Sequence, residues 1–256
     1  MRIGVYQFAS TSIITDNLQH IRLAVSEAYS KQVRLLVFHE CALCGYPPIE
    51  TSIDEISKSE MEKALCEVAA LAKTYKMFIA VGTVRFFGEN RYNSIAVIND
   101  NGNIIGFYDK KALWGWDKEN FSRGTSKGVF EIDSLKVGFR ICFDVRFPEL
   151  FRELYKEGTD ICFISFSDTT ANPPNERYNI IKSHLVTRAA ENVMTVISVN
   201  SITNFQTAPT AVFDCNGNVV KEAKIGREEL LVYDYDRQKI TYSAEGRIAN
   251  SNFFIK

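Results

Sequence analysis

The chain has 256 residues, of which 46% are hydrophobic and 24% are charged, so it can bury a full core as one large α/β domain or two small ones. Its 30 basic and 31 acidic side chains give a net charge of -1. This balance lacks the basic footprint of a protein that binds nucleic acid or an anionic membrane, and it favours a small-molecule partner.

The first residues of the chain and the cysteines indicate the cellular compartment. Residues 1–9 alternate like a strand and lack the basic-then-apolar order of a signal peptide. No apolar run approaches the ~18 residues that a membrane span needs. We therefore expect a cytoplasmic protein with no membrane partner, whose cysteines all stay reduced. These cysteines occupy positions 41, 44, 66, 142, 162 and 215.

The first half of the chain predicts strands that alternate with helices and then a hairpin. The continuous apolar run Leu35–Phe38 is typical of a strand covered on both faces, and it ends on His39-Glu40. Asp100-Asn101-Gly102 is a strong hairpin signal, and the second arm of that hairpin leads into Lys110. Strands are predicted over residues 2–9, 35–38, 77–84, 94–98 and 104–108, and helices over residues 18–29 and 61–75.

The second half repeats this pattern. A short apolar strand ends at Cys142, a polar loop runs through residues 172–174, and a second hairpin turns at Asn216-Gly217. Strands are predicted over residues 137–141, 161–166, 194–199 and 230–235, and helices over residues 148–156 and 178–192. Because no linker or repeat separates the two halves, we expect a single α/β domain over residues 1–256, with two sheets packed face to face and helices outside.

Three of the predicted strand ends carry a polar residue, namely Glu40, Lys110 and Cys142. Taken singly, each has an ordinary explanation, as a surface charge, a solvated cation and a small buried hydrophobe. Together they form a chemical set, because a thiol attacks a carbonyl carbon only as the thiolate. Glu40 would take the thiol proton, whereas Lys110 and the backbone N–H of Phe143 would face the oxyanion of a tetrahedral intermediate.

Four motifs surround these residues in a fixed order: Phe38-His39-Glu40, Gly45-Tyr46-Pro47, Tyr108-Asp109-Lys110 and Ile141-Cys142-Phe143-Asp144-Val145-Arg146-Phe147-Pro148-Glu149. With Tyr92-Asn93-Ser94 and residues 184–192, they resemble the nitrilase superfamily, the carbon-nitrogen hydrolases, over nearly all of the chain. The resemblance implies a four-layer α-β-β-α sandwich of two mostly mixed sheets and a homodimer or higher homo-oligomer. It also implies a Glu-Lys-Cys triad without metal or organic cofactor, which maps onto Glu40, Lys110 and Cys142.

The sequence does not decide which carboxylate assists the lysine or what role His39, Cys41 and Cys44 have. Family members often carry a second glutamate near the lysine, and both Asp117 and Glu119 lie in the segment that resembles that region. His39 stands where proline is usual in the family. With Cys41 and Cys44 it forms a pattern whose spacing alone suggests zinc or a redox pair. We expect instead that the histidine packs locally and that both cysteines are core residues, with no metal.

The residues after Cys142 resemble the amide-hydrolysing branch that includes ω-amidases. This favours a small amide, such as the ω-amide of a dicarboxylate, over a nitrile. If Asp168 points into the pocket, it favours a substrate with a cationic end, such as a carbamoylated amine; if it points to solvent, the ω-amide is the better fit. The side chains expected to contact substrate are Tyr46, Trp114, Trp116, Arg146, Phe166, Ser167 and Asp168.

Other classes of protein remain as alternatives. Within the family these are an N-carbamoyl-amine or N-carbamoyl-amino-acid amidohydrolase and a nitrilase. Outside enzymes, a ligand-binding protein is disfavoured by the complete triad. A zinc or thiol protein would require Cys41 and Cys44 to be the functional residues.

Overall fold

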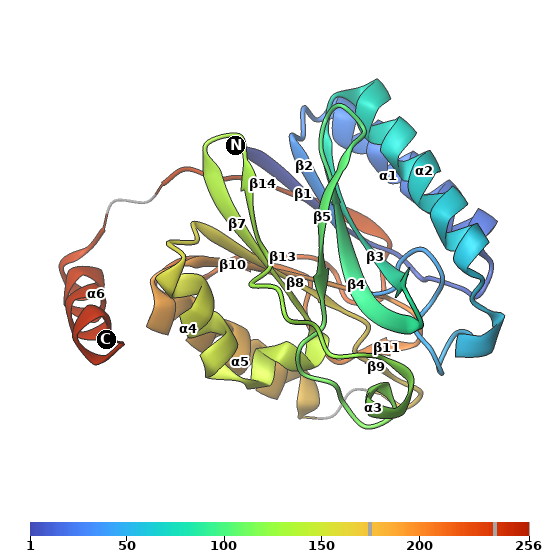
Figure 1. Cartoon of the computed structure of the whole chain (residues 1–256). Helices are drawn as coiled ribbons and strands as arrows, with labels where there is room; N and C mark the ends of the chain where they lie inside the picture. Colours follow the sequence, from blue (N-terminus) through green and yellow to red (C-terminus); the bar gives the residue numbers. More distant parts are fainter. Residues whose placement is uncertain (174–175, 238–239, 256) are drawn as a thin grey trace.

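The structure is a computed structural model that describes residues 1–173, 176–237 and 240–255. Two sheets form its centre, as Figure 1 shows. The predicted polar loop at residues 172–174 ends in Pro174, which lies outside the described residues. No described helix combines the length and the apolar character needed to cross a membrane.

The first sheet has six strands in the order β14-β1-β2-β3-β4-β5. Its inner strands β1, β2 and β3 run parallel, whereas β4, β5 and β14 are antiparallel to their neighbours. The strands are β1 (Arg2–Gln7), β2 (Leu35–Phe38), β3 (Phe78–Phe87), β4 (Asn90–Ile98), β5 (Ile104–Asp109) and β14 (Glu229–Asp234).

The second sheet also has six strands, in the order β13-β12-β10-β8-β7-β6. Here β7, β8 and β10 run parallel, and β6, β12 and β13 are antiparallel to their neighbours. The strands are β6 (Val129–Ile132), β7 (Leu135–Ile141), β8 (Ile161–Phe166), β10 (Thr195–Asn200), β12 (Ala211–Phe213) and β13 (Val219–Glu222). A two-stranded sheet joins β9 (Thr169–Thr170) to β11 (Phe205–Gln206).

Helices α1, α2, α4 and α5 cover the outer faces of the sheets. Figure 1 shows α1 and α2 beside the first sheet and α4 and α5 beside the second. The α-helices are α1 (Ile14–Ser30), α2 (Lys58–Tyr75), α3 (Asp117–Asn120), α4 (Pro148–Lys156), α5 (Arg177–Asn192) and α6 (Tyr242–Phe254), and the 3-10 helices are η1 (Ile53–Glu55) and η2 (Cys142–Arg146).

Apolar side chains fill the three spaces between these four layers. Phe139 of β7 and Phe163 of β8 belong to the core between the sheets, and their rings stack with centroids 5.6 Å apart. A second core joins α1 and α2 to the first sheet, and a third joins α4 and α5 to the second. The predicted α-β-β-α sandwich of two mixed sheets is confirmed.

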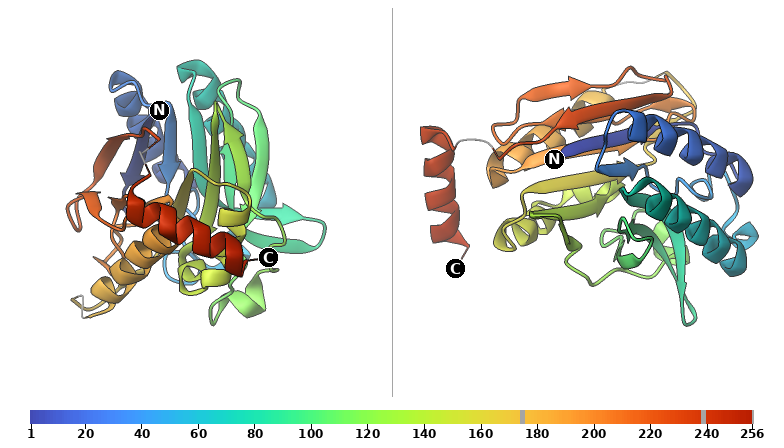
Figure 2. Two further views of the ribbon diagram at one scale, coloured as in Figure 1. Left: turned by 90° about the vertical axis from the view of Figure 1, so that its left-hand side faces the viewer. Right: turned by 90° about the horizontal axis from the view of Figure 1, so that it is seen from above.

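The elements that the sequence analysis did not predict include β6 and α6. The strand before Cys142 is one arm of a hairpin, because β6 pairs antiparallel with β7. The helix α6 lies across α4 and α5 (Figure 2), where Tyr155 donates a hydrogen bond to Asn252 (2.8 Å) and Arg152 donates one to Ser251 (3.1 Å).

Candidate active site

The ends of four strands converge on one cavity, two from each sheet. Glu40 follows β2 and Lys110 follows β5 in the first sheet, whereas Cys142 follows β7 and Ser167 follows β8 in the second. A cavity of about 300 Å³ lies between them, lined by Lys110, Cys142 and Ser167. The carboxyl ends of parallel strands are the usual place for ligands in α/β folds, so this cavity is the candidate active site.

Glu40 is fully buried, and its carboxylate is fixed by three hydrogen bonds. Oε1 accepts from Asn93 Nδ2 (2.6 Å) and from Lys110 Nζ (2.8 Å), and Oε2 accepts from the backbone N–H of Ser167 (2.8 Å). The last bond crosses from the first sheet to the second. Burial raises the pKa of Glu40, whereas Lys110 lowers it.

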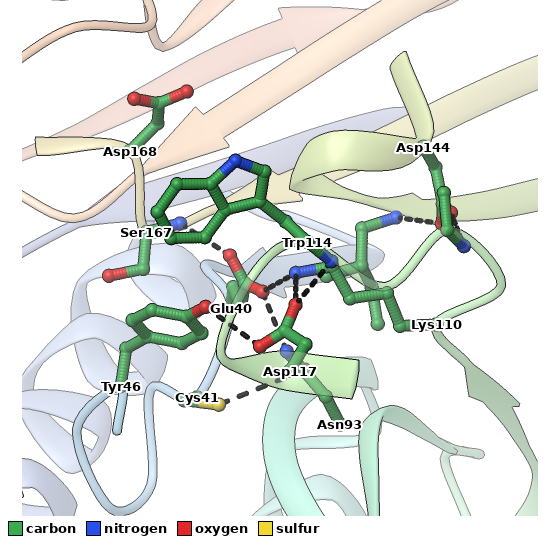
Figure 3. A network of polar contacts seen from close by, with 12 residues as sticks. Glu40, Cys41, Tyr46, Asn93, Lys110, Trp114, Asp117, Asp144, Ser167 and Asp168 are labelled. Carbon is green, nitrogen blue, oxygen red and sulfur yellow. Dashed lines mark hydrogen bonds and ion pairs between the residues drawn. The ribbon is translucent and has the colours of Figure 1, made fainter. Parts of the chain in front are cut away.

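Lys110 lies between two buried carboxylates. Its Nζ donates to Glu40 Oε1 (2.8 Å) and to Asp117 Oδ2 (2.7 Å), as the dashed lines in Figure 3 show. Burial by itself lowers the pKa of Lys110, but Glu40 raises it, and so does Asp117, with the net effect that its pKa lies well above the usual range. The ammonium group is therefore charged, and it stands at a fixed place in the cavity wall.

Cys142 sits at a sharp turn where the chain leaves β7 for η2. Its φ angle of +42° lies in the left-handed region, which non-glycine residues adopt rarely and which is strained at a tight turn. Asp144 holds the turn: Oδ2 accepts from the backbone N–H of Ile141 (2.9 Å) and from the hydroxyl of Tyr108 (2.7 Å), and Oδ1 accepts from the backbone N–H of Ala112 (2.7 Å). These bonds tie the nucleophile turn to the loop that follows Lys110.

Charges in the site act on the thiol. Burial raises the pKa of Cys142, the nearby Glu40 raises it further, and Lys110 opposes both effects. These effects favour the neutral thiol, which would need a base in order to act as a nucleophile. Glu40 is the carboxylate with the largest effect on the thiol, so it is suited to that role.

Two glycines allow the backbone to approach the site closely. A Cβ on Gly82 of β3 would lie 2.1 Å from the carbonyl oxygen of His39, and one on Gly124 would lie 2.0 Å from that of Asp109. These carbonyls belong to the residues directly before Glu40 and Lys110. The missing side chains therefore help to set the positions of both polar residues.

The structure distinguishes the two auxiliary carboxylates. Asp117 is buried at the start of α3, binds Lys110 and accepts a hydrogen bond from the hydroxyl of Tyr46 (2.8 Å). Glu119, two residues further on, is exposed and takes no part in this network. Helical geometry explains the difference, because neighbours two apart on a helix point in different directions.

Five of the seven predicted substrate contacts line the cavity: Tyr46, Trp114, Arg146, Ser167 and Asp168. The other two do not. Trp116 packs against Phe121, with ring centroids 5.8 Å apart, and Phe166 is fully buried in the core under α4 and α5. Both expectations followed only from nearness in sequence to residues that do reach the cavity.

His39, Cys41 and Cys44 are all buried behind Glu40. The His39 ring packs against Phe8 at a centroid distance of 4.6 Å, and its Nδ1 lies 3.0 Å from the carbonyl oxygen of Glu40. Both sulfurs belong to the same small apolar cluster as Tyr46. Among the described residues, no group of three or more His, Cys, Asp or Glu side chains is arranged to hold a metal ion.

Two polar residues of the site were missed in the sequence. Asn93 binds Glu40, and its polar side chain in a largely buried strand was a signal for it. Arg177 lines the cavity at the start of α5 and pairs with Asp168. It follows a polar loop, and nothing in its local sequence marks it as part of a site.

Residues 2–244 match the family model described as Carbon-nitrogen hydrolase. The chain is 31% identical to 2-oxoglutaramate amidase of Bacillus subtilis, over 80% of this chain and 79% of the relative. It is 27% identical to Glutamine-dependent NAD(+) synthetase of Aquifex aeolicus over 84% of its own length, but it spans only 38% of that protein. Its fold is similar to that of a mutant amidase from Nesterenkonia sp. AN1 carrying acrylamide on its active-site cysteine, with a TM-score of 0.83, 20% identity and 99% of both chains covered. The chain therefore belongs to the carbon-nitrogen hydrolase family, the nitrilase superfamily that its four motifs predicted.

Proposed function

We propose that this protein is an amidase that hydrolyses the ω-amide of a small dicarboxylate and releases ammonia through a thioester on Cys142. The observation that carries the proposal is the placement of the Lys110 ammonium between Glu40 and Asp117 in the wall of the cavity that Cys142 also lines. A carboxylate base, a fixed cation and a thiol are the parts that acyl transfer requires.

In the first half of the reaction, Glu40 takes the proton of the Cys142 thiol while the sulfur attacks the amide carbon. The tetrahedral oxyanion faces Lys110 and the backbone N–H of Phe143. When the intermediate collapses, Glu40 returns the proton to the nitrogen, the carbon-nitrogen bond breaks, and ammonia leaves from a thioester.

In the second half, a water molecule replaces ammonia. Glu40 removes one of its protons as the oxygen attacks the thioester carbon. The carbon-sulfur bond then breaks, the acid product forms, and the proton on Glu40 restores the thiol. Because the carboxylate is held by Asn93, Lys110 and Ser167, it keeps the same position in both halves.

The charges that line the cavity favour an anionic end on the substrate. The Asp168 carboxylate is neutralised by Arg177, with Nε–Oδ1 and Nη2–Oδ2 distances of 2.8 Å. Arg146 instead contacts His184 (3.2 Å), and burial lowers the pKa of this histidine, as does Arg146 itself. No carboxylate of the described residues forms an ion pair with Arg146, so its positive charge is available to an acidic substrate. The 2-oxoglutaramate amidase likeness agrees with such a substrate.

An N-carbamoyl amino acid is the second candidate, since it too has an anionic end beside a cleavable carbon-nitrogen bond. The carbamoylated amine fits less well, because the carboxylate that would receive its cationic end already pairs with Arg177.

Replacement of the nucleophile tests the proposal. We expect Cys142→Ala to lose ammonia release from small ω-amides by at least about 10⁴-fold while keeping its fold, as judged by circular dichroism. The control is Cys66→Ala, which alters an exposed cysteine on α2 and should keep full activity. Unchanged turnover in Cys142→Ala would refute the mechanism.

The acyl group can be identified by trapping it. A Glu40→Gln variant lacks the base that activates water, so a thioester formed slowly from a metabolite pool should persist on Cys142. Intact-mass analysis would give the mass of the acyl group, and digestion would locate it on Cys142.

A further inference from the structure

The residues that line the cavity include one carboxylate, that of Asp168, outside the cluster around Lys110. Figure 3 shows the Asp168 carboxylate pointing away from the cluster of Glu40, Lys110 and Asp117. It lies at the end of the loop that carries Ser167, and only 6% of its side chain is exposed. Its hydrogen-bond partners therefore lie on its other side.

Hydrogen bonds hold both the carboxylate and the backbone of Asp168. Arg177 binds both carboxylate oxygens, and the hydroxyl of Thr207 donates to Oδ1. The backbone N–H of Asp168 donates to Asn200 Oδ1 (2.9 Å), and its carbonyl accepts from Asn200 Nδ2 (2.9 Å) and from the backbone N–H of Thr207 (2.9 Å). An ordered, buried carboxylate of this kind is a rigid anchor for the guanidinium that it binds.

Arg177 is the exposed member of this pair. Its side chain is 47% accessible and lines the same cavity as Cys142 and Arg146. The pair also lies within electrostatic reach of the nucleophile, because Asp168 raises the pKa of Cys142 and ionised Cys142 raises that of Arg177. A cation is therefore presented at the cavity in one fixed orientation.

A guanidinium that is already oriented loses little side-chain entropy when it binds a carboxylate. With Arg146 on the same cavity, two guanidinium groups and one carboxylate line this wall, which leaves a net positive charge. Such a wall attracts an anionic group and repels a cationic one.

We propose that Arg177 is a specificity-determining residue that binds the carboxylate at the far end of the acyl chain, and that Asp168 is the positioning residue that orients it. This inference rests on the amidase function proposed above. In this proposal Asp168 does not bind a cationic substrate; it orients Arg177, which binds an anionic one.

The test compares three amides with the same acyl backbone: succinamate, which is anionic, butyramide, which is neutral, and 4-aminobutyramide, which is cationic. In Arg177→Gln we expect the ratio of kcat/KM for succinamate to that for butyramide to fall about tenfold, mainly through KM. Arg177→Lys keeps the charge but loses the bidentate contact with Asp168, so it should retain part of the preference for succinamate.

Arg237→Gln is the matched control. Arg237 also binds an aspartate, Asp160, through Nε (3.0 Å) and Nη2 (3.3 Å), but it does not line the cavity. The Arg237→Gln substitution also removes one positive charge, and it should leave the ratio of kcat/KM for succinamate to that for butyramide as in the wild type. A ratio within twofold of the wild type in Arg177→Gln would overturn the proposal.

Two further measurements separate this inference from the proposed function. In the Cys142→Ala background, which performs no chemistry, calorimetry should show succinamate bound about tenfold more weakly when Arg177→Gln is added; equal binding overturns the inference even if amides are hydrolysed. A wild type that prefers 4-aminobutyramide, and loses that preference in Asp168→Asn, would assign the recognition to Asp168 and also overturn it.

Discussion

Lys110 places one positive charge between the buried carboxylates of Glu40 and Asp117. In the proposed mechanism this arrangement affects the basicity of Glu40 as well as the stability of the oxyanion. Burying an unpaired charge is costly, so each partner of Lys110 stabilises the site. Asp117 also acts through space on Glu40, whose pKa it raises after the larger effects of burial and Lys110. A carboxylate with a raised pKa is a stronger base toward the thiol. We therefore propose that Asp117 positions Lys110 and raises the basicity of Glu40.

We expect Asp117→Asn to lower kcat/KM by about tenfold to a hundredfold and to move the acidic limb of the pH–rate profile to lower pH. The asparagine can still accept from Lys110, but its missing charge leaves Glu40 with a lower pKa and less basicity. Glu119→Gln is the control in the same helix and should change neither quantity. If both variants behave alike, Asp117 has no part in tuning the base.

His39 makes stability depend on pH. Burial lowers its pKa from 6.5 to about 4. Between these values the unfolded chain binds a proton that the folded chain does not, so the free energy of unfolding falls as the pH is lowered through this window. The full shift corresponds to about 3 kcal/mol.

A non-titrating replacement of similar size should remove this dependence. We expect His39→Leu to lose less stability than the wild type between pH 6.5 and pH 4.5, measured as the free energy of unfolding in urea. The other titrating groups contribute equally to both proteins, so the wild type serves as the reference. Equal losses in the two proteins would show that His39 is not the group responsible.

At the scale of elements, the turn after β2 is shaped by the neighbouring strand β3. The backbone N–H of Leu43 donates to the carbonyl of Gly82 (3.0 Å), and the chain at His39 passes where a side chain on Gly82 would lie. The position of Glu40 therefore depends on a strand that contributes no functional side chain of its own at this point.

Gly82→Ala should destabilise the protein by about 3 kcal/mol or more and displace Glu40, because the new methyl group would meet backbone atoms rather than a movable side chain. Thermal unfolding and kcat/KM would both report the change. The matched substitution is Gly246→Ala in α6, where no atom lies within 4 Å of the new Cβ and alanine is the better helix former. A Gly82→Ala protein with wild-type stability would contradict this account of the turn.

The sequence predicts elements well where their periodicity is strong. The buried strand Leu35–Phe38 was predicted with its observed bounds, since four apolar residues precede an abrupt polar pair. The hairpin of β6 and β7 was missed because its turn at Asp133 carries no glycine, although Asp133 adopts a φ of +52°. Helix α6 was missed because polar and apolar residues do not segregate along it, and most of its surface stays exposed.

At the scale of the whole molecule, the sequence analysis identified the polar strand ends and most of the side chains that line the cavity, but not the contacts that hold them in place. Glu40, Lys110 and Cys142 each follow a strand, which is a local pattern, and the fold brings their strand ends together. The contacts of Ser167 and Arg177 depend on how the two sheets pack, and no local pattern contains that information. The homodimer implied by the resemblance involves a second copy of the chain, and it stays a prediction.

The hydrogen bond from Ser167 N–H to Glu40 joins residues that are 127 positions apart, and Ser165 forms a similar link to the carbonyl of Phe38 (2.9 Å). During synthesis, Glu40 and Lys110 are made well before Cys142, and Ser167 is made after all three. The proposed base and the proposed nucleophile belong to different sheets, so the site is complete only when both sheets have docked.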